Sequence, residues 1–288
     1  MISIIISTIA GIICGFGYMY GLNGEWGSYL AGIMGALLAF FLVNRKVQGP
    51  LNGIIMRVQN KMQEASDQVQ KKVNHFQNKP GGNQAAFMKT VEKIQKDATV
   101  EALVYLDEAE KFYKWNFMIE KQIQTMRFQM NFQIKNFEEV DKYIDSVMLF
   151  DPSVVTMKMA RLYKKDPLKK VEGEDGAAAL KNWSVTKTFK KGSGRLKGDK
   201  ATMVYSTYAW MLIKSGFHEE ALATLVEGSK KTADEIMVKN IERIRNGKAK
   251  SFSNARYGEI WYALYLEEPP KQKQKVVRQN ARNAGRPF

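Results

Sequence analysis

Two apolar runs at the start of the chain constrain its fold more than any other feature. Residues 2–22 and 27–43 each approach the roughly 20 apolar residues that a helix needs to cross a bilayer. Glu25, in the short polar link between the runs, is the one charged side chain between residues 2 and 43. Two such runs in direct succession predict an antiparallel transmembrane hairpin over residues 1–46.

A cleaved signal peptide is the alternative interpretation of the first run. The run lacks a preceding basic segment and a small-x-small cleavage site, and a second apolar run follows it directly. Small residues at four-residue spacing predict that the two helices pack closely, although such residues are common in membrane helices generally. These residues are Gly11, Gly15, Gly17, Gly21, Ala31, Gly35 and Ala39.

The distribution of basic residues predicts the orientation of the hairpin. The link between the runs carries no Lys or Arg, whereas Arg45, Lys46, Arg57 and Lys61 follow the second run. Positive charge collects on the cytoplasmic side of membrane proteins. We therefore expect an integral membrane protein whose folded part faces the cytoplasm, in the inner membrane if the source is bacterial.

The overall composition excludes several classes of site. Cys14 is the only cysteine, so no intramolecular disulfide and no thiolate metal cluster can form. His75 and His218 are the only histidines and lie far apart in the sequence, so we expect no metal site and no cofactor. The net charge of +15 predicts an anionic partner, which could be lipid headgroups, nucleic acid or an acidic protein.

Residues 47–83 are predicted to form an amphipathic stalk helix and a linker. The helix ends at the segment NKPGGN, residues 78–83, because proline and paired glycines do not sustain a helix. Its apolar stripe is interrupted by Lys72 and consists of Leu51, Ile55, Val58, Met62, Ala65, Val69 and Phe76. The stripe fits a coiled coil with a second copy or docking against the downstream domain, and its Ala and Lys favour docking. A homo-oligomer through the hairpin or the stalk stays open.

From residue 84 to residue 268 the periodicity is helical, and no strand pattern of useful length occurs, so the fold class is all-α. Two segments share one pattern: NFEEVDKYIDSVMLFDP at 136–152 and GFHEEALATLVEGS at 216–229. Each follows a predicted helix, at residues 117–135 and 201–214 respectively. Together they predict two helical hairpins.

A helix, a tight turn, a second helix and a proline-like stop resemble the tetratricopeptide repeat, whose unit is about 34 residues. The second hairpin carries the resemblance through Tyr205, Tyr208, Ala209, Leu212, Gly216, Glu220, Ala221 and Leu225. The first keeps Phe137, Glu139 and the ending Asp151-Pro152, but has Phe128 where the family places a small residue. Residues 154–164 with 177–189, and 234–245 with 254–266, form two further candidate units.

The resemblance implies an α-solenoid, in which stacked hairpins share a continuous core and leave a groove. It further implies that peptides or helices of other proteins bind in this groove. The candidate groove contacts are Gln124, Asn131 and Lys158.

Two basic segments are candidates for contact with anionic partners. The segment KKGSGRLKGDK, residues 190–200, lacks the Gly-Lys-Ser/Thr of a phosphate-binding loop, so we interpret it as a basic surface loop. Its region offers Lys187, Lys190, Lys191, Arg195, Lys197 and Lys200. Residues 269–288 form a basic tail that we expect to be disordered and drawn to anionic lipid. The tail offers Lys271, Lys273, Lys275, Arg278, Arg282 and Arg286.

No set of residues is typical of a catalytic site. The acidic pair Glu138-Glu139 lies near Lys142 on a predicted helix, which favours ion pairing over acid–base catalysis. His218 takes an aromatic packing position of the repeat. We therefore predict a membrane-anchored scaffold that recruits proteins, and not an enzyme. The alternative is a membrane-tethered RNA- or ribosome-binding protein that uses residues 187–200 and 271–288.

Overall fold

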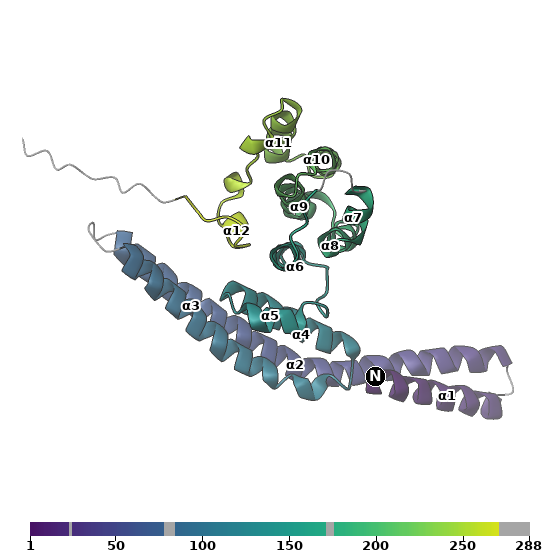
Figure 1. The fold of residues 1–288 in the computed structure, drawn as a ribbon. Coiled ribbons are helices and arrows are strands. Elements are labelled where there is room, and N and C mark those ends of the chain that lie inside the picture. The colour runs from purple at the N-terminus through teal and green to yellow at the C-terminus, as the bar shows by residue number, and fades with distance from the viewer. Residues whose placement is uncertain (23–24, 78–83, 171–175, 271–288) are drawn as a thin grey trace, which may run out of the picture.

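The computed structural model describes residues 1–22, 25–77, 84–170 and 176–270, and within these ranges it contains helices and turns but no strand (Figure 1). The helices are α1 (Ile2–Leu22), α2 (Glu25–Gln77), α3 (Gln84–Asp107), α4 (Phe117–Gln133), α5 (Phe137–Tyr143), α6 (Pro152–Lys165), α7 (Gly176–Asn182), α8 (Ser184–Ser193), α9 (Thr202–Lys214), α10 (His218–Thr232), α11 (Glu235–Arg245) and α12 (Glu259–Tyr262). Short 3-10 turns lie at Glu110–Phe112, Gly198–Ala201, Ala249–Ser251 and Ala255–Tyr257. The all-α prediction is therefore confirmed for the described residues.

Helix α1 and the first part of α2 form an antiparallel pair that projects from the rest of the molecule, here called the apolar hairpin (Figure 1). The apolar stretch of each helix is long enough to cross a membrane. Their large side chains point outward, with Ile13 65% exposed and Phe41 61% exposed. A helix in the core of a water-soluble protein would bury such side chains, so this exposure suits a lipid environment.

Small residues set the distance between the two helices of the apolar hairpin. A Cβ added to Gly11 would lie 2.8 Å from Cβ of Ala36, and one added to Gly35 would lie 2.6 Å from Sγ of Cys14. Gly15 packs against Gly32 in the same interface.

The predicted packing roles of Gly17 and Gly21 are wrong, because an added Cβ at either position would meet nothing within 4 Å. A helix turns about 100° per residue, which rotates these two glycines away from the face that carries Gly11 and Gly15. Ala31 and Ala39 are half-buried beside the interface. Sequence analysis missed Ser3 and Ser7 on α1, which are buried.

Helix α2 is a single helix of 53 residues that passes through Pro50 without ending. The second apolar run and the predicted stalk are therefore parts of one helix. Beyond the apolar hairpin, α2 packs antiparallel against α3, as the docking interpretation predicted. The shared hydrophobic cluster comprises Val47, Leu51, Ile54 and Val58 of α2, Ala102, Leu106 and Ala109 of α3 and the turn after it, and Ile119, Ile123 and Met130 of α4.

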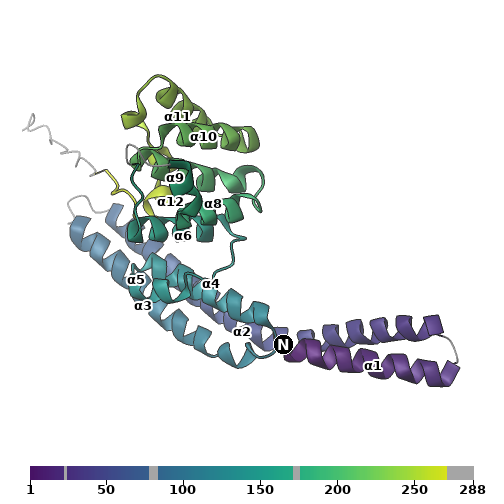
Figure 2. The ribbon, with the colours of Figure 1, turned by 45° about the vertical axis from the view of Figure 1, so that its right-hand side comes forward.

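The remaining helices form two layers on one side of this pair (Figures 1 and 2). The first layer, α4 and α5, lies on α2 and α3. The second layer, which we call the module, contains α6 to α12. Helix α9 is its centre, with Tyr205, Tyr208, Trp210 and Met211 all buried among α6, α8 and α10.

The predicted helical hairpins differ in how well they match the structure. Residues 202–232 form the antiparallel pair α9–α10, with the turn at Gly216 in a left-handed conformation, φ 88°. In the first pair, α5 ends after seven residues, at Tyr143. Phe128 is fully buried with Phe132 in the core, so the site accommodates a large ring where the repeat has a small residue.

The two further candidate units are irregular. Predicted helix 177–189 is divided at Trp183 into α7 and α8, because the indole of Trp183 turns inward and donates a hydrogen bond to the carbonyl of Asp166, 2.9 Å. Residues 254–266 form a 3-10 turn and the single-turn helix α12 rather than a full helix.

Gly228→Ala tests the close approach of α10 to α9. The added methyl carbon would lie 2.9 Å from both Cβ and Cγ of Tyr205, and Cβ can move only with the backbone of α9. We expect a loss of about 1–3 kcal/mol in the free energy of unfolding, measured by circular dichroism in detergent. Gly53→Ala makes the same change in open space on α2 and should stabilise by about 0.5–1 kcal/mol. Equal stability changes for the two variants would contradict the proposed contact.

Candidate functional site

The first turn of α1 is hydrogen-bonded to the segment between α3 and α4. The backbone N–H of Ile2 donates to the carbonyl of Lys114 at 3.0 Å, and the N–H of Ser3 donates to the carbonyl of Trp115 at 3.2 Å. The Ser3 hydroxyl donates to the same Trp115 carbonyl at 2.8 Å. The first N–H groups of a helix have no partner within it, so these bonds satisfy donors that an apolar environment would leave unpaired.

The segment that receives these bonds has the composition of a membrane–water interface. Residues 111–115 read KFYKW, and the Lys111 ammonium lies 5.3 Å from the ring centre of Phe112. Aromatic rings and basic residues collect at that depth of a membrane. Arg45 and Lys46 follow the apolar part of α2. Basic residues therefore lie at one end of the apolar hairpin, on α2 and in the segment that is hydrogen-bonded to α1.

Tyr113 of this segment is half-buried. Its hydroxyl is enclosed and has no hydrogen-bond partner among the described residues. Burial, which disfavours the charged phenolate, raises the pKa of Tyr113 to about 12, and the nearby Arg127 guanidinium opposes this shift.

A highly charged concavity lies between the two layers. We call it the basic cleft; its volume is about 560 Å³, and it is formed by the first half of α4, residues 145–150, α6 and α8. Its charged lining residues are Lys121, Asp145, Lys158, Lys187, Lys191 and Arg195. Five cations therefore face one carboxylate.

Lys158 is half-buried in the cleft, and this burial lowers the pKa of its ammonium group. The carboxylate of Asp145 opposes this shift, and the neighbouring ammonium of Lys191 adds to it. Lys158 makes no salt bridge with any residue that the structure describes. An anion bound in the cleft would favour the charged form of Lys158.

A second hollow, of about 460 Å³, lies between α2 and α4. We call it the Met/Gln groove, after its lining residues Val58, Gln59, Met62, Gln63, Met126, Gln129, Met130 and Gln133. None of these residues carries a charge. The groove can therefore bind apolar surface and uncharged hydrogen-bonding groups.

The three predicted groove contacts do not come together. Gln124 donates to the carboxylate of Glu120 on its own helix, 3.0 Å. Asn131 is only 4% exposed; it donates to the Arg127 carbonyl and accepts from the side chain of Asn136. Its predicted role as a partner contact is wrong, because its side chain holds the turn from α4 to α5. Of the three, Lys158 alone lies in a concavity.

The predicted anionic contacts are divided. Lys187, Lys191 and Arg195 line the basic cleft, whereas Lys190, Lys197 and Lys200 are exposed but are not among its lining residues. The tail residues Lys271, Lys273, Lys275, Arg278, Arg282 and Arg286 lie outside the described residues. Sequence analysis missed Lys121, whose distance along the chain from the basic loop gives no signal that the two are neighbours.

The described residues offer no metal site, since no group of three His, Cys, Asp or Glu side chains is placed to hold an ion. His75 lies on α2 and His218 at the start of α10. The arrangement is suited to binding anions and uncharged surfaces.

No family model matches this chain, and no curated protein and no solved structure matches it. Its function is therefore inferred from its own fold, charge and geometry.

Tyr113→Phe tests the burial of the interface segment. Because the pKa of Tyr113 is raised to about 12 in the folded chain, its ionisation does not affect stability below pH 10, and it lowers the stability of the folded state as pH rises from about 10 through about 12. We expect the variant to be at least as stable as the parent at pH 8, because an unpartnered buried hydroxyl is removed. Its melting temperature should also fall less between pH 9 and pH 11. Tyr20→Phe, at a side chain 83% exposed, is the control. An equal alkaline loss in all three proteins would contradict the burial of Tyr113.

Proposed function

We propose that this protein is a membrane-anchored scaffold that holds a helical module at the cytoplasmic surface of a membrane and recruits partner proteins there. One observation carries the proposal: α2 runs as one helix from the apolar hairpin into the hydrophobic cluster with α3 and α4. A membrane anchor joined to a folded part by a flexible linker would leave that part free to turn. A continuous helix instead fixes the orientation of the folded part and its distance from the membrane.

A second connection also attaches the folded part to the apolar hairpin. The first turn of α1 is bonded to the carbonyls of Lys114 and Trp115, directly before α4 begins. Both helices of the hairpin are thus attached to the folded part. This double attachment is what a scaffold requires, because partners bound to it are held at a defined position relative to the bilayer.

The Met/Gln groove is the proposed partner site. Methionine side chains are flexible and polarisable, so they adapt to different apolar surfaces. An amphipathic helix laid in a groove buries its apolar face there. The partner segment that fits is such a helix, with apolar residues toward Met62 and Met126 and uncharged polar residues toward the four glutamines. The likeness of α9–α10 to a tetratricopeptide pair agrees with a role in protein binding.

RNA or ribosome binding is the second candidate, favoured by the exposed Lys190, Lys197 and Lys200 beside the basic cleft. Base stacking needs exposed aromatic rings. Trp183 and Trp261, two aromatic residues that have basic residues nearby in the sequence, are buried. The scaffold proposal is therefore the stronger of the two.

Site-specific labelling tests the anchoring. In a Cys14→Ser background, Trp26→Cys places a thiol near the distal end of the apolar hairpin, and Lys197→Cys places one on the module. In sealed membrane vesicles, an impermeant maleimide should label the two positions from opposite sides, with Lys197→Cys on the cytoplasmic side. Labelling of both from the same side would refute the transmembrane hairpin.

Photo-crosslinking tests recruitment. Benzoylphenylalanine at Gln59 faces the Met/Gln groove, whereas the same residue at Gln68 lies on the exposed surface of α2 outside the groove. We expect one or a few proteins to be captured from Gln59 and not from Gln68. Met126→Arg should abolish that capture and release the captured protein from membranes. Capture of a second copy of this chain alone, or identical products from both positions, would count against a scaffold for other proteins.

A further inference from the structure

We propose that the basic cleft binds the phosphate headgroup of an anionic phospholipid from the membrane that holds the apolar hairpin. This inference rests on the proposed function, because the anchor brings lipid to the cleft. It assigns the cleft a ligand that is distinct from the protein partner of the Met/Gln groove.

The first support is the balance of charge. Elsewhere in the structure, cations with little exposed surface are neutralised: Arg127 bonds to Asp107 at 2.6 Å and to Glu110 at 2.8 Å. Arg161 makes two hydrogen bonds to the carboxylate of Asp141, at 2.8 and 2.7 Å. The basic cleft instead has five cations and a single carboxylate. Four of these cations, Lys158, Lys187, Lys191 and Arg195, make no salt bridge with any residue that the structure describes, so their charge is available to a ligand.

The second support is that packing brings these cations together at a fixed position. Gly192 of α8 lies against Val155 of α6, so closely that an added Cβ would be 2.5 Å from the nearer methyl carbon of Val155. This contact places Lys191 and Lys158 on the walls of one cleft. Ser146 and Ser184 also line it and offer hydroxyls to phosphate oxygens.

The third support is an apolar rim, which a free anion would not need. Between residues 105 and 237, Met118 and Phe150 are the only exposed large apolar side chains that the structure describes, at 40% and 60% exposure. Both line the basic cleft. The guanidinium of Arg195 lies 4.9 Å from the ring centre of Phe150, so charge and apolar surface adjoin. A phospholipid has the same arrangement, a charged headgroup joined to acyl chains.

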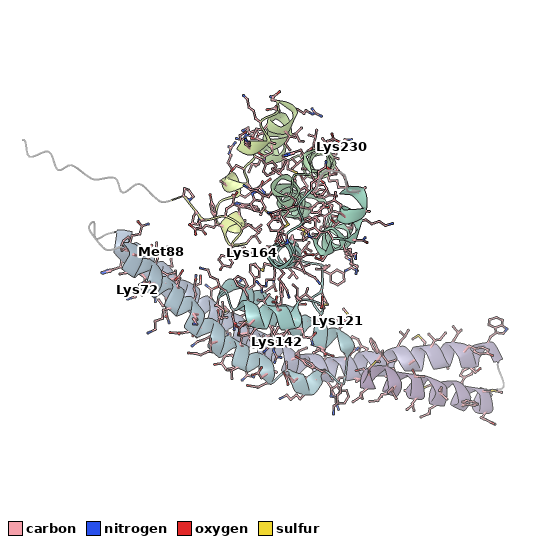
Figure 3. All side chains as sticks on the ribbon, viewed as in Figure 1. Lys72, Met88, Lys121, Lys142, Lys164 and Lys230 are labelled. Atoms are coloured by element: carbon pink, nitrogen blue, oxygen red, sulfur yellow. The ribbon has the colours of Figure 1, made fainter. Side chains whose placement is uncertain are left out.

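The fourth support is the position of the cleft. Helix α4 begins directly after the interface segment 111–115, and Lys121 lies near the end of α4 that adjoins the apolar hairpin (Figure 3). Helix α8 lies on the side of the module toward the apolar hairpin in both ribbon views, whereas α12 lies on the opposite side (Figures 1 and 2). The basic cleft is therefore on the side of the folded part that faces the bilayer surface.

Lipid binding to the full-length chain in neutral detergent tests the inference. Native mass spectrometry measures the affinity for phosphatidylglycerol, for phosphatidylcholine and for glycerol 3-phosphate, the soluble headgroup. We expect phosphatidylglycerol to bind most tightly. The triple variant Lys187→Gln, Lys191→Gln and Arg195→Gln should bind it at least about tenfold more weakly, because each basic group near an anionic lipid contributes to affinity.

The matched control removes the same number of cations from the same stretch of chain, outside the cleft lining. Lys190→Gln, Lys197→Gln and Lys200→Gln together should change the affinity by less than about twofold, since screened surface charges contribute little. Equal losses in the two triple variants would overturn the inference in favour of nonspecific attraction. An affinity for glycerol 3-phosphate equal to that for phosphatidylglycerol would overturn the inference in favour of a soluble phosphate ligand.

Lys158→Met provides a second variant whose folding is not in question. Replacing a partly buried ammonium by an apolar side chain of similar length should raise the melting temperature while it weakens phosphatidylglycerol binding. Unchanged affinity in this variant would overturn the inference. Failure of the anchoring is recognised separately, because the chain would then leave membranes in an alkaline carbonate wash, whatever its affinity for lipid.

Discussion

The packing of the apolar stripe of α2 against α3 and α4 is the contact on which the rest of the structure depends. Val47, Leu51, Ile54 and Val58 are nearly inaccessible to solvent there. Full burial of such a side chain contributes about 1.5–3 kcal/mol. These residues belong to the same helix as the second apolar run, so the cluster transmits the position of the apolar hairpin directly to the folded part. The bonds from α1 to residues 114 and 115 add a second point of attachment and oppose rotation about α2.

The distribution of ion pairs separates the structural cations from those available for binding. Arg57 pairs with Glu108 and Lys61 with Glu101, so the two pairs join α2 to α3 and to the turn directly after it. Arg127 of α4 pairs with Asp107 at the end of α3 and with Glu110 in the turn after it, and Arg161 of α6 pairs with Asp141 of α5. The cations of the basic cleft gather around a single carboxylate, where their mutual repulsion disfavours the folded state. Natural proteins accept such a loss of stability where binding requires it. The Met/Gln groove is uncharged by contrast, so the two hollows are suited to chemically different ligands.

Much of the fold could be predicted from the sequence, because it depends on patterns within single helices. The apolar hairpin, the amphipathic stalk and the pair α9–α10 all follow from spacing and composition, whereas the predicted break at 78–83 lies outside the described residues. The errors have local causes. Gly17 and Gly21 share the spacing of the interface glycines but lie on another face of α1. The repeat position of Asn131 predicts a partner contact, whereas its side-chain amide oxygen accepts a hydrogen bond from Asn136 and holds the turn. The continuity of α2 through Pro50 was missed, since polar residues and a proline usually mark a boundary.

The sequence by itself determined the helical class, the two apolar runs and the excess of positive charge, because hydrophobicity and charge act residue by residue. It did not determine which cations would be neighbours. Lys121, Lys158 and Lys191 lie on α4, α6 and α8, and no periodicity links three separate helices. Only the tertiary structure decided that they line one cleft, since the approach of α8 to α6 depends on Gly192 fitting against Val155. The physical reason is that close packing is a property of two surfaces together, and neither helix encodes it alone.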